Sequence, residues 1–168
     1  MFKLPLEFDK NEWFVTLTMI FLIIIFSIVP KLMPRGMTLS ILLYFSVLGL
    51  TADILIGVDY PFNFYKIMDS SKLEVFDVLI YGVNYTLYGY FFSYFIYKWE
   101  TRRANFLLVI LWIGLSTLIE WVSEKFNVFT YTNGWHIGLS AISYIFVYTL
   151  SVIIIRFFIR LWKYTDPT

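Results

Sequence analysis

The sequence contains no cysteine and a single histidine, His136. The missing cysteines exclude disulfides, thiolate catalysis and cysteine-ligated metals. Short catalytic motifs are missing as well: the chain has no HExxH zinc motif, no GxSxG nucleophile motif, no glycine-rich phosphate loop and no DDxxD motif of prenyl-transferring membrane enzymes. No local motif therefore indicates an enzyme class.

Charge is also scarce, and apolar residues take its place. Only 15% of the residues are charged and the net charge is +1, whereas 60% are hydrophobic and 22% are aromatic. The near-neutral balance excludes the basic surface that binding to nucleic acid requires. A chain of 168 residues cannot bury this much apolar surface in one small soluble core. The composition therefore predicts the lipid bilayer as a partner.

The apolar residues gather in five stretches of roughly 17 or more residues, a length that crosses a bilayer. Pro30 ends the first stretch, because proline blocks the continuation of a helix. We predict an all-α integral membrane bundle that forms a single membrane domain over residues 1–168. Its five transmembrane helices are expected at about 13–29, 37–56, 75–97, 104–122 and 135–158.

The segment between the second and third spans, residues 57–74, is too polar to cross a membrane and is interrupted by Pro61. It carries four aromatic residues: Tyr60, Phe62, Phe64 and Tyr65. Such rings concentrate at the boundary between membrane and water. We therefore expect an interfacial aromatic segment between the second and third helices.

Lysine and arginine indicate the orientation, since positive residues in short loops stay on the cytoplasmic side. With five spans, one side of the membrane receives eight of them: Lys31, Arg35, Lys98, Arg102, Arg103, Arg156, Arg160 and Lys163. The other side receives five: Lys3, Lys10, Lys66, Lys72 and Lys125. We therefore predict a plasma-membrane protein with its N-terminus outside and its C-terminus in the cytoplasm.

This topology brings titratable side chains from several helices to one depth. At about 1.5 Å per residue, Asp53, Asp77, Glu120 and His136 fall within about one helical turn of the outer boundary. Ionisable groups within spans usually face the bundle interior or a water-filled cavity. We therefore expect an outward-facing polar pocket roofed by the loop at residues 126–135. The candidate ligand-binding residues are Asp53, Asp77, Asn84, Tyr88, Glu120, Asn133, Trp135, His136, Ser140 and Tyr144.

Two chemistries and one purely structural interpretation are open for this pocket. Carboxylates with an imidazole can bind a hard divalent cation; the candidate metal ligands are Asp53, Asp77, Glu120 and His136. Glu120 and His136 can instead act as acid and base on a substrate, which makes them the candidate catalytic residues. Each of these side chains lies near a helix end, where it can also simply reach water. The sequence identifies no cofactor.

A longer pattern covers the fourth and fifth spans. Glu120 ends one span, and Ser140 and Tyr144 lie in the next. The aromatic loop between them contains Val128, Phe129, Thr130, Tyr131, Asn133 and Trp135. This pattern, with five short spans and an aromatic segment before the third, resembles a family of small uncharacterised multi-pass inner-membrane proteins of spore-forming bacteria. The resemblance implies an all-helical inner-membrane protein and supplies no activity, substrate or cofactor.

Three function classes remain. The first is a component that binds or transports a small ligand or ion at the polar pocket. The second is an accessory or structural subunit that contacts another copy, as a homo-oligomer, or a different membrane protein. The third is an enzyme that acts on a lipid or isoprenoid at the outer leaflet. Glycine would allow close helix approach in any of these; the candidates are Gly49, Gly82, Gly89, Gly114 and Gly138.

Overall fold

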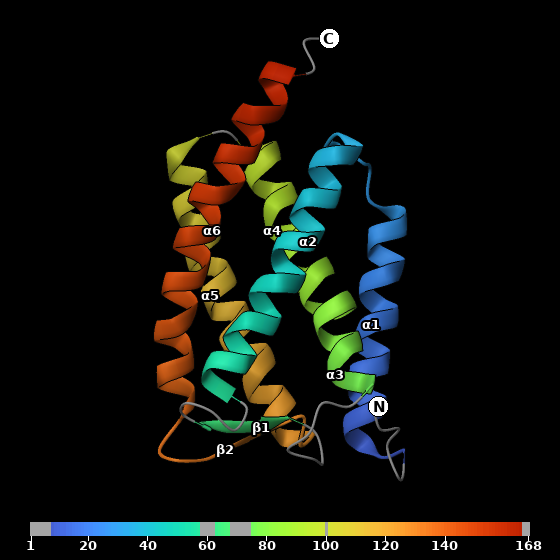
Figure 1. The fold of residues 1–168 in the computed structure, drawn as a ribbon, viewed down its shortest axis with the longest axis vertical. Coiled ribbons are helices and arrows are strands. Elements are labelled where there is room, and N and C mark those ends of the chain that lie inside the picture. The colour runs from blue at the N-terminus through green and yellow to red at the C-terminus, as the bar shows by residue number, and fades with distance from the viewer. Residues whose placement is uncertain (1–7, 58–62, 68–74, 100, 166–168) are drawn as a thin grey trace.

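The computed structural model describes residues 8–57, 63–67, 75–99 and 101–165, which form a helical bundle with two short strands at one end (Figure 1). Among the described residues, four helices are long and apolar enough to cross a membrane. They are α1 (Lys10–Ile28), α2 (Arg35–Ala52) with its π-helical continuation η1 (Asp53–Gly57), α5 (Arg102–Lys125) and α6 (Ile137–Thr165). The predicted all-helical architecture is confirmed, and four of the five predicted spans correspond to these long apolar helices.

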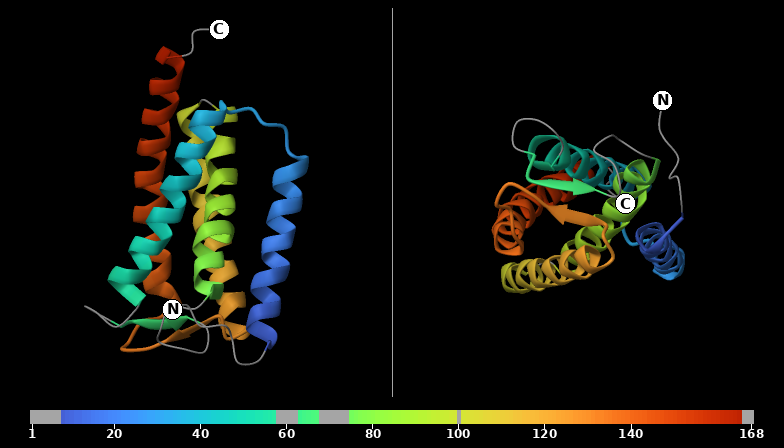
Figure 2. Two further views of the ribbon diagram at one scale, coloured as in Figure 1. Left: turned by 45° about the vertical axis from the view of Figure 1, so that its right-hand side comes forward. Right: turned by 90° about the horizontal axis from the view of Figure 1, so that it is seen from below.

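The third predicted span is helical but less apolar than the others. It consists of α3 (Val75–Leu79), the π-helical turn η2 (Ile80–Tyr85) and α4 (Thr86–Lys98). It runs from the strand end of the bundle to the opposite end (Figures 1 and 2). Nine of the thirteen residues of α4 are buried, and α4 contacts α1, α2, α5 and α6. This segment is therefore the centre of the bundle, and its crossing of a membrane stays a prediction.

Side-chain caps determine where several helices begin. Asp9 and Glu12 form a capping box, in which the Asp9 side chain accepts from Asn11 N and Glu12 Oε2 accepts from Asp9 N, both at 3.0 Å. For this reason α1 begins three residues before the predicted span. Thr101 caps α5 by accepting from Ala104 N at 3.2 Å. At the end of the bundle opposite the start of α1, the C-terminal turns of α6 extend past the neighbouring helices (Figure 1).

A two-stranded antiparallel sheet lies across the end of the bundle at which α1 starts (Figure 2). It pairs β1 (Tyr65–Ile67) with β2 (Phe129–Tyr131), with Tyr65 opposite Tyr131 and Ile67 opposite Phe129. The sequence interpretation placed β1 in an interfacial segment and β2 in a roofing loop, and it did not predict that they pair. Residues 58–62 and 68–74 of the interfacial segment lie outside the described residues, and its position at a membrane boundary stays a prediction.

Glycine allows close contact between helices at two of the predicted positions. A Cβ atom added to Gly89 would lie 2.1 Å from Phe45 Cγ, and one added to Gly49 would lie 2.4 Å from Tyr85 Cδ2. By contrast, nothing lies within 4 Å of such an atom at Gly82. Close packing by glycine therefore joins α2 to η2 and α4.

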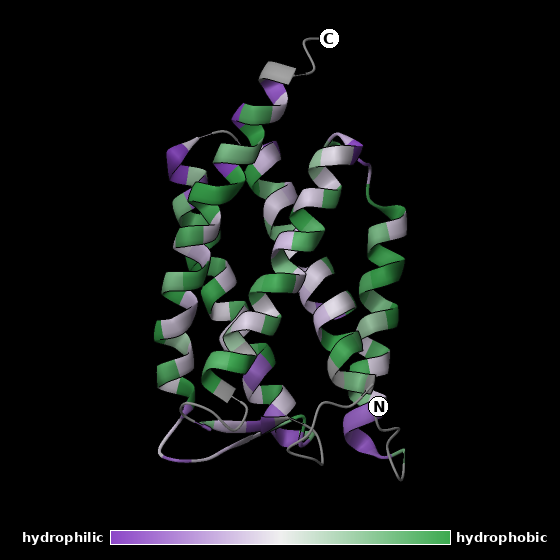
Figure 3. Cartoon of the chain, viewed as in Figure 1, coloured by the Kyte–Doolittle hydropathy of each residue, from purple (hydrophilic) through white to green (hydrophobic). Residues whose placement is uncertain are grey.

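The outward faces of the long helices are apolar, while polar residues gather at the two ends (Figure 3). Large side chains such as Phe21, Leu43, Phe106 and Phe146 are exposed along the lengths of these helices. A bilayer favours an apolar perimeter, because lipid offers no partner to polar groups. The perimeter is therefore compatible with contact to a lipid bilayer.

Candidate functional site

Glu120 lies on the inward face of α5, close to the strand end of the bundle. It belongs to a series of buried residues, Leu108, Trp112, Ser116 and Glu120, that recur every four positions. Residues four apart share one face of a helix, so this series faces the interior along most of α5. Only 8% of the Glu120 surface is exposed.

Three hydroxyl groups donate hydrogen bonds to the Glu120 carboxylate. Oε1 accepts from the Tyr131 hydroxyl at 2.9 Å and from Ser140 Oγ at 2.6 Å. Oε2 accepts from the Tyr144 hydroxyl at 2.6 Å. The donors come from β2 and from successive turns of α6, so one side chain of α5 joins three elements. We call Glu120, Tyr131, Ser140 and Tyr144 the Glu120 centre.

Trp135 connects the Glu120 centre to the sheet that covers it. Its indole Nε1 donates to Ser140 Oγ at 2.9 Å, and its ring stacks on Phe64 with centroids 5.0 Å apart. The preceding turn is tight, because Asn133 and Gly134 have φ angles of 48° and 81° and Trp135 N donates to Thr132 O at 3.0 Å. Two successive positive φ angles define a type I′ turn, which asparagine and glycine favour. This turn holds the indole above Ser140.

The hydrogen-bond donors around the Glu120 carboxylate are neutral hydroxyl groups. No cationic side chain of the described residues lies within salt-bridge distance of Glu120, whose partners are the three hydroxyls. Burial first, and then the negative charge of Glu120, raise the pKa of Tyr131 above its ordinary value. The Tyr131 phenol therefore stays protonated, and remains a donor, throughout the physiological pH range.

A second hydroxyl cluster lies one helical turn further into the bundle. Ser116 Oγ shares hydrogen bonds with the Tyr88 hydroxyl at 3.0 Å and with the Tyr148 hydroxyl at 2.6 Å. The rings of Tyr144 and Tyr148 have centroids 6.1 Å apart, so the cluster adjoins the Glu120 centre. Most buried hydroxyls in proteins are hydrogen-bonded, and here residues from α4, α5 and α6 pair with one another.

The structure brings together four of the predicted site residues: Glu120, Trp135, Ser140 and Tyr144 form one connected network. Tyr88 lies in the adjoining hydroxyl cluster. These positions agree with a buried polar site below the loop at residues 126–135.

Three other predicted residues have different surroundings. His136 is exposed and caps α6, since its Nδ1 accepts from Gly138 N at 3.2 Å. Asn133 is exposed in the type I′ turn, and its side chain donates to Asn63 O at 2.9 Å. Asn84 joins η2 to α1 by donating to Thr18 Oγ1 at 3.1 Å. None of these three has a hydrogen bond to Glu120.

The structure describes two of the four predicted metal ligands, Glu120 and His136, with their side chains. The backbones of Asp53 and Asp77 belong to η1 and α3, but their side chains lie outside what the structure describes. Among the described residues, no group of three or more His, Cys, Asp or Glu side chains could hold a metal ion. Glu120 and His136 are the two candidate ligands whose side chains are described, and one is buried while the other is exposed.

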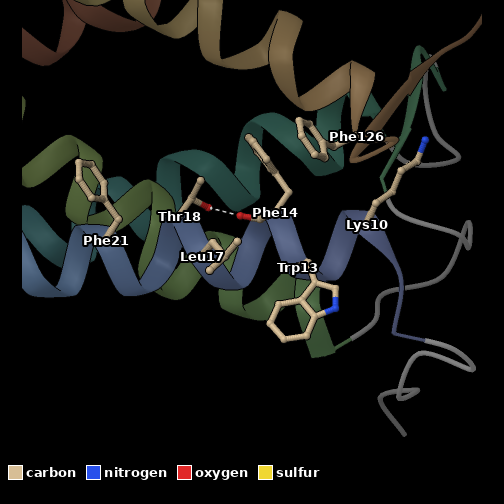
Figure 4. A pocket seen from close by; sticks show the side chains of 7 residues that line it. All are labelled: Lys10, Trp13, Phe14, Leu17, Thr18, Phe21 and Phe126. Atoms are coloured by element: carbon tan, nitrogen blue, oxygen red, sulfur yellow. Dashed lines mark hydrogen bonds between the residues drawn. The ribbon is translucent and has the colours of Figure 1, made fainter.

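A groove of about 480 Å³ lies away from the Glu120 centre, beside α1 and the end of α5 (Figure 4). It is lined by Lys10, Trp13, Phe14, Leu17, Thr18, Phe21 and Phe126. The lining is almost entirely apolar, and Trp13, Leu17 and Phe21 belong to the exposed face of α1. The groove is therefore part of the outward apolar surface and contains none of the predicted site residues.

Sequence reasoning missed Tyr131 and Tyr148 as members of the two polar clusters. Tyr131 lies two residues from the turn signal at Asn133, but only its pairing with β1 and its distance to Glu120 distinguish it from the other loop aromatics. Tyr148 follows Ser140 and Tyr144 at intervals of four, and that helical spacing could have identified it.

Comparison with protein-family models, with curated proteins and with solved structures finds no match for this chain. The resemblance to small inner-membrane proteins of spore-forming bacteria therefore stays a prediction.

Proposed function

We propose that this chain is a five-span membrane protein that binds or transports a small cation at the Glu120 centre, which is accessible from the outer face. The observation that supports the proposal is a buried carboxylate whose partners are neutral hydroxyls, without a cationic partner among the described residues. Burying a negative charge without a positive partner costs free energy through lost hydration, even where hydroxyls donate to it. A bound cation would offset that cost.

The surrounding donors suit such a role. Tyr131, Ser140 and Tyr144 stabilise the charged form of Glu120 before a ligand arrives, so the site is already assembled. Trp135 covers the centre and is held by Ser140, which itself binds Glu120. A cation at Glu120 would therefore affect the hydrogen bond that keeps Trp135 in place.

The proposed orientation depends on which end of the bundle carries more lysine and arginine residues. The start of α1 and the end of α6 lie at opposite ends of the bundle, and the sheet lies at the end where α1 starts (Figure 1). The eight lysines and arginines of the opposite end would face the cytoplasm by the positive-inside rule. Since the chain has no cysteine, an introduced Asn133→Cys would be the only thiol. An impermeant maleimide should label it in intact cells, and labelling only after permeabilisation would reverse the orientation.

Thermal unfolding of the purified protein in detergent tests the proposed function. At constant pH, we expect at least one of Na⁺, K⁺, Ca²⁺, ammonium and methylammonium to raise the Tm of the wild type. If none of these ions does so, we expect acidification in their absence to raise it. Glu120→Gln should abolish that increase, because the amide carries no charge. Glu124→Gln is the matched control, since Glu124 lies one turn further along α5 and accepts none of the three hydroxyl bonds.

A different result would assign the chain to another of the three function classes. If neither acidification nor any of these ions changes the Tm through Glu120, the centre is a structural cross-link between α5, β2 and α6. The accessory-subunit hypothesis would then replace cation binding.

A further inference from the structure

The groove beside α1 combines an apolar channel with a charged end. Lys10, the first residue of α1, lies at one end of the groove and Phe21 lies at the other (Figure 4). Leu17 lies between them, and the side chains of Leu17 and Phe21 are 58% and 62% exposed. Among the residues that line the groove, Lys10 carries the only charge. An occupant of the groove therefore meets a cation at one end and mainly apolar side chains along the rest.

A stacked pair of rings forms one wall of the groove. The ring centroids of Phe14 on α1 and Phe126, which follows the last residue of α5, are 4.7 Å apart. Elsewhere α1 packs mainly against η2 and α4. Because the two rings hold each other in place, this wall is formed without an occupant.

The polar groups of the lining are either donors at the charged end or already paired. Lys10 and Trp13 are three positions apart in the first turn of α1, so they lie on one face, and their side-chain N–H groups can only donate. Thr18 lies further along, and its hydroxyl donates to Phe14 O and Val15 O, both at 2.9 Å. The groove therefore suits an occupant with an acceptor group at one end and an apolar chain beyond it.

The acidic side chains at the start of α1 do not occupy this end of the groove. Asp9 accepts from Asn11 N, Glu12 Oε2 accepts from Asp9 N, and neither acid lines the groove. Lys10 itself is exposed. The charged end is therefore complementary to an anionic group.

The length of the groove matches one leaflet of a bilayer. Phe21 follows Lys10 by eleven positions, which is about 16 Å along a helix. One leaflet contributes about half of a hydrocarbon core roughly 30 Å thick. A membrane-spanning helix of a partner would need an apolar surface across both leaflets, whereas a single acyl chain needs only one.

We propose that this groove binds an anionic phospholipid, with the phosphate of the headgroup at Lys10 and Trp13 and one acyl chain along Leu17 to Phe21. The proposal takes α1 as a membrane-spanning helix and goes beyond the proposed function, because none of these residues belongs to the Glu120 centre. One lysine near the membrane surface should give about a fivefold preference for an anionic over a zwitterionic phospholipid with the same chains.

Quenching by brominated lipids tests the proposal. Since the chain has no cysteine, Ile20→Cys provides a single site for a fluorescent maleimide one turn after Leu17, on an exposed position of α1. Phe146→Cys provides the matched label, because Phe146 is exposed and lies at a similar distance from the start of α6. The full chain is reconstituted in phosphatidylcholine vesicles that contain increasing fractions of phosphatidylglycerol, with one of the two lipids brominated on its chains.

The relative affinity for the two lipids is then compared at the two labels. We expect a preference for phosphatidylglycerol of about fivefold at position 20, and a ratio close to one at position 146. In the Ile20→Cys protein, Lys10→Gln should reduce the preference to near one, whereas Lys10→Arg should keep it. Lys125→Gln should also keep it, since Lys125 is an exposed lysine that does not line the groove. Because Lys10 is exposed, these variants should fold as the wild type does.

Three results would overturn the proposal. Equal ratios at the two labels would mean that the groove does not select a lipid, and a preference that survives Lys10→Gln would mean that the headgroup lies elsewhere. A label at position 20 that neither brominated lipid quenches would show that protein covers the groove, as in an interface with a second copy.

Discussion

Replacing Glu120 with alanine is expected to lower the free energy of unfolding by about 3–5 kcal/mol, the range for removing one partner of a buried charged network. The change leaves the hydroxyls of Tyr131, Ser140 and Tyr144 without their acceptor in the bundle interior. Hydrogen bonds to charged groups contribute about 1.5–3 kcal/mol each, and unpaired buried donors add a desolvation cost. Denaturation in mixed detergent measures the loss.

Two other variants show whether this loss belongs to the carboxylate. Glu120→Gln retains an oxygen that can accept from Tyr131 and Ser140, so we expect a smaller loss of about 1–2 kcal/mol. Glu124→Ala removes a carboxylate outside the network and should stay within about 0.5 kcal/mol. Equal losses in Glu120→Ala and Glu124→Ala would contradict the structure of the centre.

A methyl group at Gly89 should destabilise the bundle by about 3 kcal/mol, the upper part of the usual range for overpacking. The added Cβ would lie 2.1 Å from Cγ and 2.3 Å from Cδ1 of Phe45, whose ring is itself buried. Because these atoms are close to the backbone of α2, the ring cannot simply rotate away. Gly89→Ala would therefore separate α2 from α4, and thermal unfolding in detergent should report a lower Tm.

The matched control is Gly82→Ala. Gly82 belongs to the same central segment, but nothing lies within 4 Å of an added Cβ. Alanine is also favoured over glycine in helices by up to about 1 kcal/mol, so we expect a neutral or slightly stabilising effect. A large loss at Gly82, or none at Gly89, would show that α2 and α4 do not pack as described.

The helices could be predicted from sequence because their signal is local. Apolar length identified four of them, and Pro30 and the charged residues near 98–103 marked their limits. Polar groups within or at the ends of apolar spans also identified Glu120, Ser140 and Tyr144 as candidate pocket residues. In the structure Ser140 and Tyr144 both donate a hydrogen bond to Glu120.

The sequence did not show the direction of a side chain at a helix end or the pairing of the two strands. His136 has the same predicted depth as Glu120, yet its side chain turns back to cap α6. Depth follows from counting residues along a helix, whereas the direction of a side chain at a helix end depends on the cap. Likewise, the pairing of β1 with β2 joins Tyr65 to Tyr131 across sixty-six residues of sequence, and neither three-residue strand carries a signal of its own.

The centre also explains why a polar interior can sit in so apolar a chain. Each hydroxyl near Glu120 or Ser116 has its partner on a different element, so polar pairing and helix packing depend on the same contacts. A change in the charge of Glu120 would alter those contacts together. Function at this site is therefore expected to involve the relative position of α5, α6 and the sheet.

The most direct measurement is a double-mutant cycle between Glu120 and Tyr144, using Glu120→Gln, Tyr144→Phe and the double variant in detergent denaturation. If the carboxylate is buried and held by α6, the two changes should be coupled by about 1–2 kcal/mol. Losses that add to within about 0.5 kcal/mol would mean that the two side chains do not interact. The Glu120 centre, and the cation site built on it, would then be wrong.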